Sequence, residues 1–181
     1  PVRPTSVAFF ADGRAAVSTV DGDVWIVSGL DHALSAVSWR RFTCDLHEPY
    51  SVAIRDGEVF TFDRSGLKRL KDFNGDGEAD FHEWFCHDFW QSAETRDFPH
   101  DMALRPDGGF YLVKGGQQND HLSRHSGRVL SVSRNGESVE VFSSGHRNAF
   151  LGIDPDTGDL FACDQQGHWV PATPVQKLQR G

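Results

Sequence analysis

A repeat of about 45–50 residues is the feature that most constrains the fold of this chain. Its four copies carry anchor positions at Ser6, Ser51, Asp101 and Leu151, spaced by 45, 50 and 50 residues. Each copy has a short apolar run, an Asp-Gly or Asp-Pro-Asp-Thr-Gly turn, and a second run that alternates. Alternation at period two predicts half-buried strands. Asp-Gly between two such runs predicts a hairpin, because glycine readily adopts the positive φ of the turn.

Two further apolar runs follow within the repeat, as in VLSVSR and SVEVFSSG between Arg128 and Gly145. Four strands in a repeat of this length are typical of a β-propeller blade. A β-sandwich is the alternative, with strands at a spacing of about 8–12 residues, but it gives no reason for a repeat. The sequence therefore predicts an all-β propeller of four-stranded blades.

The repeat count is lower than that of most closed propellers. The units are 5–48, 49–98, 99–148 and 149–181, and the last is partial because it stops after about two strands. Propellers usually close with about four to eight blades, and an open stack leaves unpaired strand edges. About three and a half blades predict that residues 1–181 are a single propeller domain or a fragment of one. Further blades of the same polypeptide, or assembly, would complete the ring.

The composition limits the kinds of binding partner that the protein can have. The net charge of −8, from 18 Lys and Arg against 26 Asp and Glu, argues against a nucleic acid or an anionic membrane surface. No apolar run approaches the ~18 residues of a membrane span, and no signal peptide is present. The chain begins at Pro1 rather than Met, which removal of a leader or excision from a longer chain would explain. The three cysteines, Cys44, Cys86 and Cys163, form no disulfide framework, and one disulfide with one free thiol stays open.

Residues 72–83 match the calcium-loop pattern D-x-[DN]-x-[DN]-G-x5-E in full. Calcium takes about six to eight oxygen ligands, which alternate residues of a tight loop can aim at one point. The predicted ligands are Asp72, Asn74, Asp76, the backbone carbonyl of Glu78, Asp80 and a bidentate Glu83. The alternative is an acidic turn that holds no ion.

The EF-hand fold is a separate matter, and the sequence argues against it. An EF-hand places helices on both sides of its loop, whereas residues 58–70 have the pattern of strand, turn and strand. Ala79 also fills the eighth loop position, where a larger apolar residue usually packs. We therefore expect a structural calcium staple between the second and third blades rather than a calcium sensor.

Candidate functional residues stand just before two inner strands. His100 follows Pro99, and a neutral imidazole at the channel of a propeller could act as a general base. The alternative is a hydrogen-bonding histidine at a blade junction. In GHRNAF, Arg147 offers a planar fork for carboxylates and Asn148 a donor and an acceptor. DQQGHW at 164–169 closes the next hairpin, so the two polar segments can converge on a ligand.

These residues carry a family resemblance. The run SGHRNAFLGIDPDTGDLFACDQQGHWVPATPV resembles the Arg-Asn blade of soluble PQQ-dependent glucose/sorbosone dehydrogenases. It is more similar still to the propellers of large exported bacterial proteins known as membrane-bound dehydrogenases, in which a D-x-Q-G-x-W-V-P run is usual. LKDFNGDGEAD and PHDMALRPDGGFYLVKGG also resemble that second group. The resemblance covers roughly residues 50–175.

The resemblance implies a six-bladed or larger ring and an exported protein. It implies oxidation of an aldose or alcohol hydroxyl, with a histidine taking the proton and a hydride passing to PQQ. By the same resemblance, Arg147 and Asn148 contact PQQ and substrate. Gln166 and Gly167 fall near the segment whose backbone carbonyls hold the calcium ion of the cofactor. That ion is distinct from one bound by residues 72–83.

The catalytic base does not transfer cleanly from the family. The sugar dehydrogenases place their histidine where this chain has Asp97, whereas His100 lies closer to Pro106 and matches a second histidine of the exported group. Either Asp97 or His100 acts as the base, or the propeller has no dehydrogenase activity. The alternative function is a non-catalytic propeller that binds a glycan or protein partner, with calcium in a purely structural role.

Overall fold

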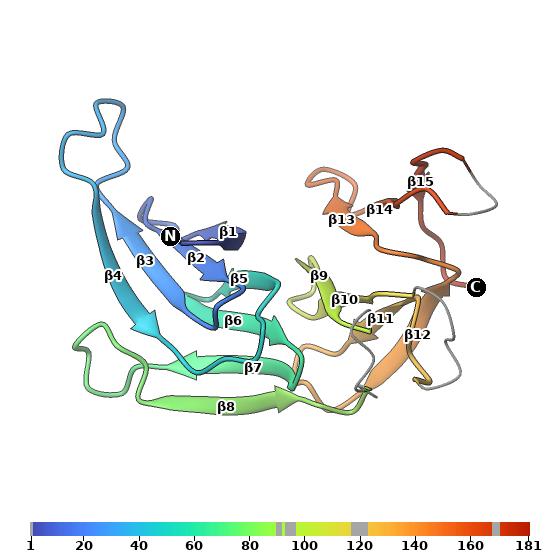
Figure 1. The fold of residues 1–181 in the computed structure, drawn as a ribbon, viewed down its shortest axis with the longest axis horizontal. Helices are drawn as coiled ribbons and strands as arrows, with labels where there is room; N and C mark the ends of the chain where they lie inside the picture. The colour runs from blue at the N-terminus through green and yellow to red at the C-terminus, as the bar shows by residue number, and fades with distance from the viewer. Residues whose placement is uncertain (1, 90–91, 93–96, 117–122, 168–170) are drawn as a thin grey trace. The chain divides into compact units, whose positions relative to one another are not determined.

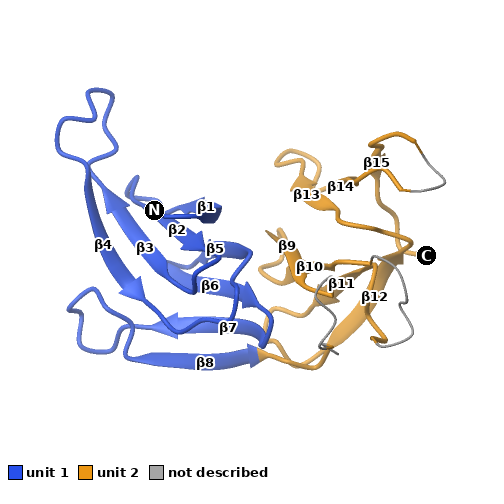
Figure 2. Cartoon of the chain, in the orientation of Figure 1, with its two compact units in different colours: residues 1–85 blue, residues 86–181 orange. Residues whose placement is uncertain are grey.

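A computed structural model describes residues 2–89, 92, 97–116, 123–167 and 171–181. All regular structure in these residues is β-strand (Figure 1). The described chain therefore contains no helix of the length and apolar character that crossing a membrane requires. The chain divides into two compact units, Pro1–Phe85 and Cys86–Gly181 (Figure 2).

The first unit holds two four-stranded sheets whose strands neighbour one another in chain order. The strands of the first sheet are β1 (Pro4–Phe9), β2 (Ala15–Thr19), β3 (Val24–Ser28) and β4 (Ser38–Thr43). Those of the second sheet are β5 (Ser51–Arg55), β6 (Glu58–Asp63), β7 (Gly66–Lys71) and β8 (Phe81–Cys86). Asp56 and Gly57 join β5 to β6 with φ values of 53° and 80°. Positive φ at both turn residues matches the hairpin turn that Asp-Gly favours.

The second unit holds one four-stranded and one three-stranded sheet. The four-stranded sheet consists of β9 (Pro99–Leu104), β10 (Phe110–Lys114), β11 (Arg128–Val132) and β12 (Val139–Ser144). The other consists of β13 (Phe150–Ile153), β14 (Leu160–Cys163) and β15 (Val175–Lys177). The last repeat thus has a third strand, where the sequence predicted about two.

Apolar side chains fill the space between the two sheets of each unit, because each sheet must bury a face against a second layer. The cluster in the first unit consists of Ala16, Val24, Leu46, Val52, Val59 and Leu70. That in the second unit consists of Val113, Val129, Ala149, Leu160, Ala162 and Leu178. The first strands of neighbouring sheets lie side by side, β1 with β5 and β9 with β13. Each sheet is therefore one blade, and the predicted β-propeller fold is confirmed.

The predicted calcium loop connects β7 to β8 of one sheet (Figure 1). β7 precedes it, as the pattern of residues 58–70 predicted, and β8 follows it. Its expected place between the second and third blades was wrong, because both strands belong to the second blade. The loop instead reaches the outer strand of the first blade, where the Ala79 N–H donates to the Phe42 carbonyl at 2.7 Å. The motif marks the turn but carries no information about which blade the turn packs against.

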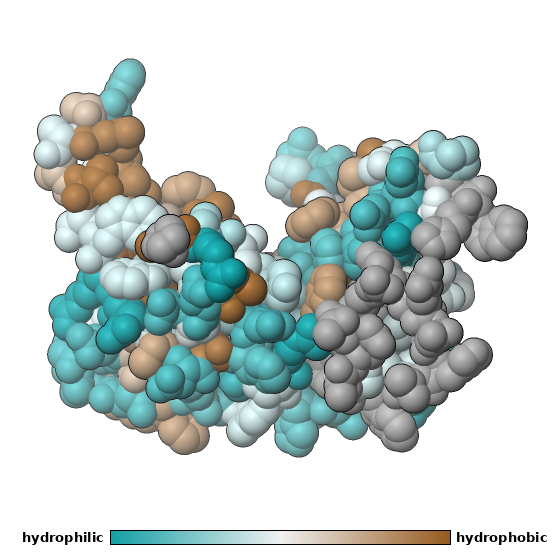
Figure 3. All heavy atoms as spheres, in the orientation of Figure 1, coloured by the Kyte–Doolittle hydropathy of each residue, from teal (hydrophilic) through white to brown (hydrophobic). Residues whose placement is uncertain are grey.

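The loop between β3 and β4 exposes apolar side chains. Leu30, Leu34 and Val37 are 39%, 60% and 38% exposed, and brown atoms gather on this projecting loop in Figure 3.

The three cysteines of the chain are all free thiols. This resolves the disulfide question that the sequence left open.

Candidate functional site

A pocket of about 470 Å³ in the second unit contains the main site candidates. Its lining comes from the start of β9, the segments around β13 and β14, and the stretch before β15. The lining residues are His100, Asn148, Phe150, Cys163, Asp164, Gln165 and Thr173. The structure thus brings together His100 and Asn148, which stand well apart in the sequence.

Two phenylalanines hold the His100 ring. Its centroid lies 5.7 Å from that of Phe98 in a stacked arrangement and 4.6 Å from that of Phe150 edge-on. The buried Nδ1 atom has no hydrogen-bond partner among the described residues. Burial lowers the pKa of His100, opposed by Asp101 and by a hydrogen bond to the Ala149 backbone. The imidazole is therefore neutral at pH 7, since its ordinary pKa is about 6.5.

Asp164, which follows β14, lines the pocket and fixes the backbone of the Arg147–Asn148 segment. Its buried carboxylate accepts the N–H groups of Arg147 at 2.9 Å, Asn148 at 2.8 Å and Gln165 at 2.8 Å. Three backbone donors on one carboxylate hold the Arg-Asn segment firmly, because hydrogen bonds to ionised groups are the strong ones. Sequence reasoning missed this residue, although an aspartate directly after a buried strand is a signal for such an anchor.

Arg147 is held at its carbonyl as well. The carbonyl accepts the Gly116 N–H at 2.7 Å. A side chain at position 116 would not fit, because its Cβ would lie 2.4 Å from the Gly127 Cα and 2.6 Å from the His146 carbonyl oxygen. With its backbone fixed on both sides, Arg147 directs Nη1 to the Gln166 carbonyl at 2.6 Å. Two predicted cofactor residues therefore lie in contact.

Asn148 is only 8% exposed. Its Nδ2 donates to the Gln165 Oε1 at 2.6 Å, while its buried Oδ1 has no partner among the described residues. An unsatisfied buried acceptor costs about 1–3 kcal/mol. A ligand that brings a donor or a cation to this oxygen would recover that energy.

Asp97, the other candidate base, does not line the pocket. Its carboxylate lies 2.6 Å from Lys114 Nζ, and the two side chains are 3% and 0% exposed. The Ser92 N–H donates to its second oxygen at 2.9 Å. A catalytic role for Asp97 stays a prediction, and this buried ion pair argues against it.

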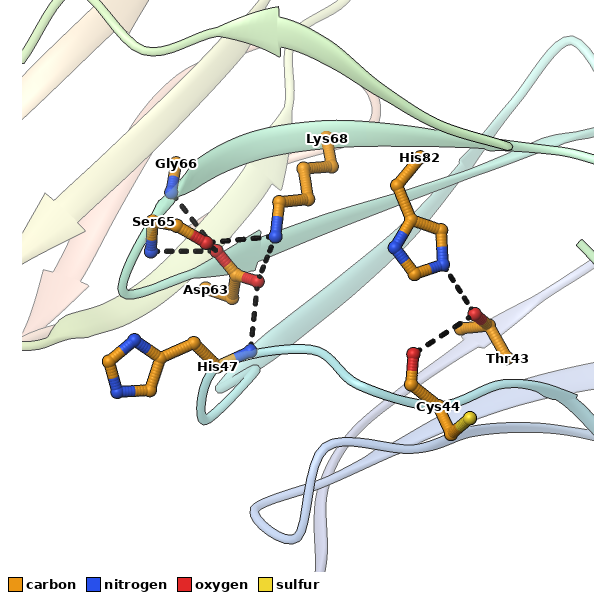
Figure 4. Close-up of polar contacts among 8 residues, drawn as sticks. All are labelled: Thr43, Cys44, His47, Asp63, Ser65, Gly66, Lys68 and His82. Carbon is orange, nitrogen blue, oxygen red and sulfur yellow. Dashed lines mark hydrogen bonds and ion pairs between the residues drawn. The ribbon is translucent and has the colours of Figure 1, made fainter. Parts of the chain in front are cut away.

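The second blade contains a comparable buried carboxylate at the end of its second strand. Asp63 ends β6 and is fully buried, and Figure 4 shows the donors that surround it. Its carboxylate accepts the N–H groups of His47 at 3.1 Å and Gly66 at 3.0 Å, and the Nζ of Lys68 at 2.7 Å. Asp63 thus ties down the segment that leads into β5, just as Asp164 ties down the segment that leads into β13.

Lys114 ends β10, the second strand of its blade, as Asp63 ends β6. Its partner Asp97 lies just before β9, the first strand of that blade. In both blades, a buried charged residue at the end of the second strand binds the segment that precedes the first strand. In the second blade this residue is an aspartate, and in the third blade it is a lysine.

The residues of the predicted calcium loop form a series of tight turns. The Asp72 carboxylate accepts the N–H groups of Gly75 at 2.7 Å and Gly77 at 2.8 Å. Asn74 accepts the N–H of Asp76 at 2.8 Å, and Asp76 that of Glu78 at 2.8 Å. At the ninth loop position, Asp80 accepts the N–H of Phe73 at 2.7 Å.

Glu83, the predicted twelfth-position ligand, lies on β8 and is engaged elsewhere. Its carboxylate contacts Arg69 at 2.5 Å and Lys71 at 3.1 Å, and the hydrogen bond from Arg69 lowers the pKa of Glu83. No group of three or more His, Cys, Asp or Glu side chains in the described chain is arranged to hold a metal ion. The structure therefore places four predicted ligand side chains in one loop, whereas Glu83 pairs with Arg69 and Lys71.

Solved structures supply a comparison with known proteins. The PQQ-bound aldose sugar dehydrogenase of Streptomyces coelicolor matches 100% of this chain and 61% of its own, with a TM-score of 0.74 and 16% identity. The PQQ domain of pyranose dehydrogenase from Coprinopsis cinerea matches 90% of this chain and 44% of its own, with a TM-score of 0.69 and 12% identity. This chain has the β-propeller fold of these dehydrogenases.

A calcium structure of a family AA12 carbohydrate-active enzyme from Trichoderma reesei has the same propeller fold. It matches 90% of this chain and 46% of its own, with a TM-score of 0.73 and 11% identity. The propeller described here spans less than two thirds of the length of each of these chains. Comparison with models of protein families and with curated proteins finds no match.

Proposed function

We propose that this propeller oxidises a hydroxyl group of a sugar or alcohol with PQQ as the cofactor. The observation that carries the proposal is the pocket in which His100 and Asn148 face one ligand space. The fold of the PQQ-bound sugar dehydrogenase supports it. An exported location, implied by the family resemblance, stays a prediction.

The residues present fit such a cofactor. The buried Oδ1 of Asn148 lacks a partner among the described residues, and Arg147 brings a guanidinium that suits a carboxylate-bearing group. Among the described residues, no atom lies within 4 Å of the place where a Cβ of Gly167 would lie, which leaves room for a ligand on that side of its backbone. Arg147, Asn148, Gln166 and Gly167 would hold the cofactor and its calcium ion. PQQ, when bound, accepts the hydride from the carbon that carries the hydroxyl.

His100 supplies the proton acceptor in this proposal. Its ring is neutral at pH 7 because burial lowers its pKa, so one ring nitrogen carries a lone pair. Phe98 and Phe150 fix the plane of the ring. The hydroxyl proton passes to His100 as the hydride leaves the same alcohol, so the carbonyl product forms with charge and electrons balanced.

The second candidate is a propeller that binds a glycan or protein partner without turnover. The observation that favours it is the buried pairing of Asp97 with Lys114, because the sugar dehydrogenases have their histidine at the position of Asp97. In that case the His100 pocket recognises a ligand and does no chemistry.

A titration with PQQ separates the two candidates. We expect a saturable absorbance change when PQQ and Ca²⁺ are added to the full-length protein, and reduction of an electron-accepting dye when an aldose follows. Binding of an aldose without any PQQ-dependent change would favour the non-catalytic propeller. A protein that binds neither PQQ nor aldose would contradict the dehydrogenase proposal and leave a protein partner as the ligand of the second candidate.

We also propose that residues 72–83 bind calcium as a structural ion. Asp72, Asn74, Asp76, Asp80 and the Glu78 carbonyl would supply ligands from the loop. Glu83 would have to leave Arg69 and Lys71 to complete the shell. Because Ala79 bonds to Phe42 of the first blade, an ion that orders the loop would stabilise the contact between the first two blades.

Chelation should lower the melting temperature. At a free Ca²⁺ concentration about 100 times the dissociation constant, the ion stabilises by about 2.7 kcal/mol. For a chain of this size that corresponds to roughly 5–10 °C. Asp76→Ala should abolish the response to EDTA, whereas Asp156→Ala, at an exposed turn of the second unit, should keep it. Unchanged melting of the wild-type protein in EDTA would contradict the proposal.

A further inference from the structure

A second pocket, of about 590 Å³, lies in the first unit beside the β7–β8 loop. Ligand pockets typically have volumes of about 300–1,000 Å³. The pocket is bounded by β3 and β4 of the first blade and by β6, β7 and the start of the calcium loop in the second. None of its lining residues belongs to the dehydrogenase-like site of the second unit.

The inner part of the pocket is apolar. Val59 and Leu70 are members of the buried cluster between the first two blades, and Phe10, Ile26 and Phe42 pack against that cluster. The floor therefore cannot collapse inward without disturbing the core. A ligand that enters must offer it an apolar face.

The rim of the pocket is polar and carries both signs of charge. Arg14, Arg40, Lys71 and Glu58 are among its lining residues. Arg40 is only loosely paired, with its guanidinium 3.6 Å from the carboxylate of Glu78. An arginine offers five N–H donors, so this contact leaves most of the Arg40 donors for a ligand.

The calcium loop adds an exposed aromatic ring at the rim. Phe73 is 71% exposed and stacks on Phe81, with 6.2 Å between ring centroids. Lys71 Nζ lies 5.9 Å from the Phe73 ring. Phe81 is itself 51% exposed, so the two stacked rings form a small apolar patch beside the pocket, and exposed apolar patches can mark ligand-binding grooves.

Together these features select the ligand chemistry. The lining carries three cations and two carboxylates, Glu58 and Asp72, so a strongly charged ligand of either sign would meet some groups of like charge. A purely apolar ligand would leave the polar rim unpaired. A pyranose presents C–H faces for aromatic rings and hydroxyls that both donate and accept hydrogen bonds. We propose that this pocket binds a short neutral oligosaccharide, whichever function the second unit performs.

Neighbouring residues of β4 provide matched controls. Arg40 lies opposite Ile26 in the sheet and Arg41 opposite Trp25, and successive strand residues point to opposite faces. The Arg40 and Arg41 side chains are 56% and 57% exposed, yet only Arg40 lines the pocket. Trp39, which is 50% exposed and does not line the pocket, is the matched control for Phe73.

Saturation-transfer NMR with cellotriose and with maltotriose tests the proposal on the full-length protein. We expect at least one of the two to bind, with affinity reduced about tenfold or more in Arg40→Ala and Phe73→Ala, since tenfold corresponds to about 1.4 kcal/mol. Arg41→Ala and Trp39→Ala should bind like the wild type, and thermal melting should confirm that all four variants are folded.

Three results would overturn the proposal. The first is no binding of either trisaccharide. The second is binding that persists in Arg40→Ala and Phe73→Ala but disappears in Asn148→Ala, which would place the sugar in the pocket of the second unit. The third is equal loss in the variants and their controls. Because neither probe needs PQQ, failure here is distinct from failure of the dehydrogenase proposal.

Discussion

Asp97→Asn should lower the free energy of unfolding by about 3–5 kcal/mol, the usual cost of removing one partner from a buried ion pair. The amide keeps the size of the side chain but removes the negative charge that lies against the Lys114 ammonium, which is 0% exposed. Lys114→Met should be similarly destabilising, because it removes the positive charge that lies against Asp97. Urea denaturation followed by tryptophan fluorescence measures both.

The double variant Asp97→Leu/Lys114→Met provides the decisive comparison. Replacing both charges by apolar groups of similar size is often neutral or stabilising, so most of the lost stability should return. Asp156→Asn, at an exposed position, should change stability little. If Asp97→Asn instead unfolds like the wild type while PQQ-dependent turnover disappears, Asp97 is the catalytic base and the structural role inferred here is wrong.

Much of the fold could be predicted because the repeat is local in sequence. Asp56 and Gly57 turn as the Asp-Gly pattern predicts, and residues 58–70 form strand, turn and strand. The third strand of the last blade, β15, was not predicted, because VQK shows no clear alternation. The place of the predicted calcium loop, residues 72–83, was mispredicted because its contact with Phe42 joins residues far apart in the chain.

In the candidate site, too, local sequence features could be predicted and contacts between distant residues could not. Arg147 and Asn148 stand out as polar residues before an inner strand, and they lie at the pocket or beside it. Asp164 and Gly116 fix these residues by hydrogen bonds to the backbone of Arg147. Single-sequence patterns carry little information about such contacts. Asp97 was ambiguous for a related reason: only the tertiary structure reveals its pairing with Lys114.

His100 should matter for turnover far more than for stability. If it accepts the hydroxyl proton, His100→Gln should lower kcat about 10²–10⁴-fold, the range typical of a lost general base. Glutamine keeps a polar side chain of similar length but has no basic nitrogen. The substitution also removes the ring contacts with Phe98 and Phe150, so thermal melting should confirm that the variant is folded before its kcat is compared. His32→Ala, in an exposed loop of the first unit, should keep full activity.

The pH profile separates a base from a residue that only shapes the pocket. A base works in its neutral form, and burial lowers the pKa of His100 from its ordinary value of about 6.5. The wild-type kcat/KM should therefore be flat from pH 7 upward and fall below that ordinary pKa, as the ring becomes protonated. His100→Gln should lose this acid limb along with most of its rate. An unchanged acid limb in His100→Gln would show that another group takes the proton, and Asp97 would again become the leading candidate.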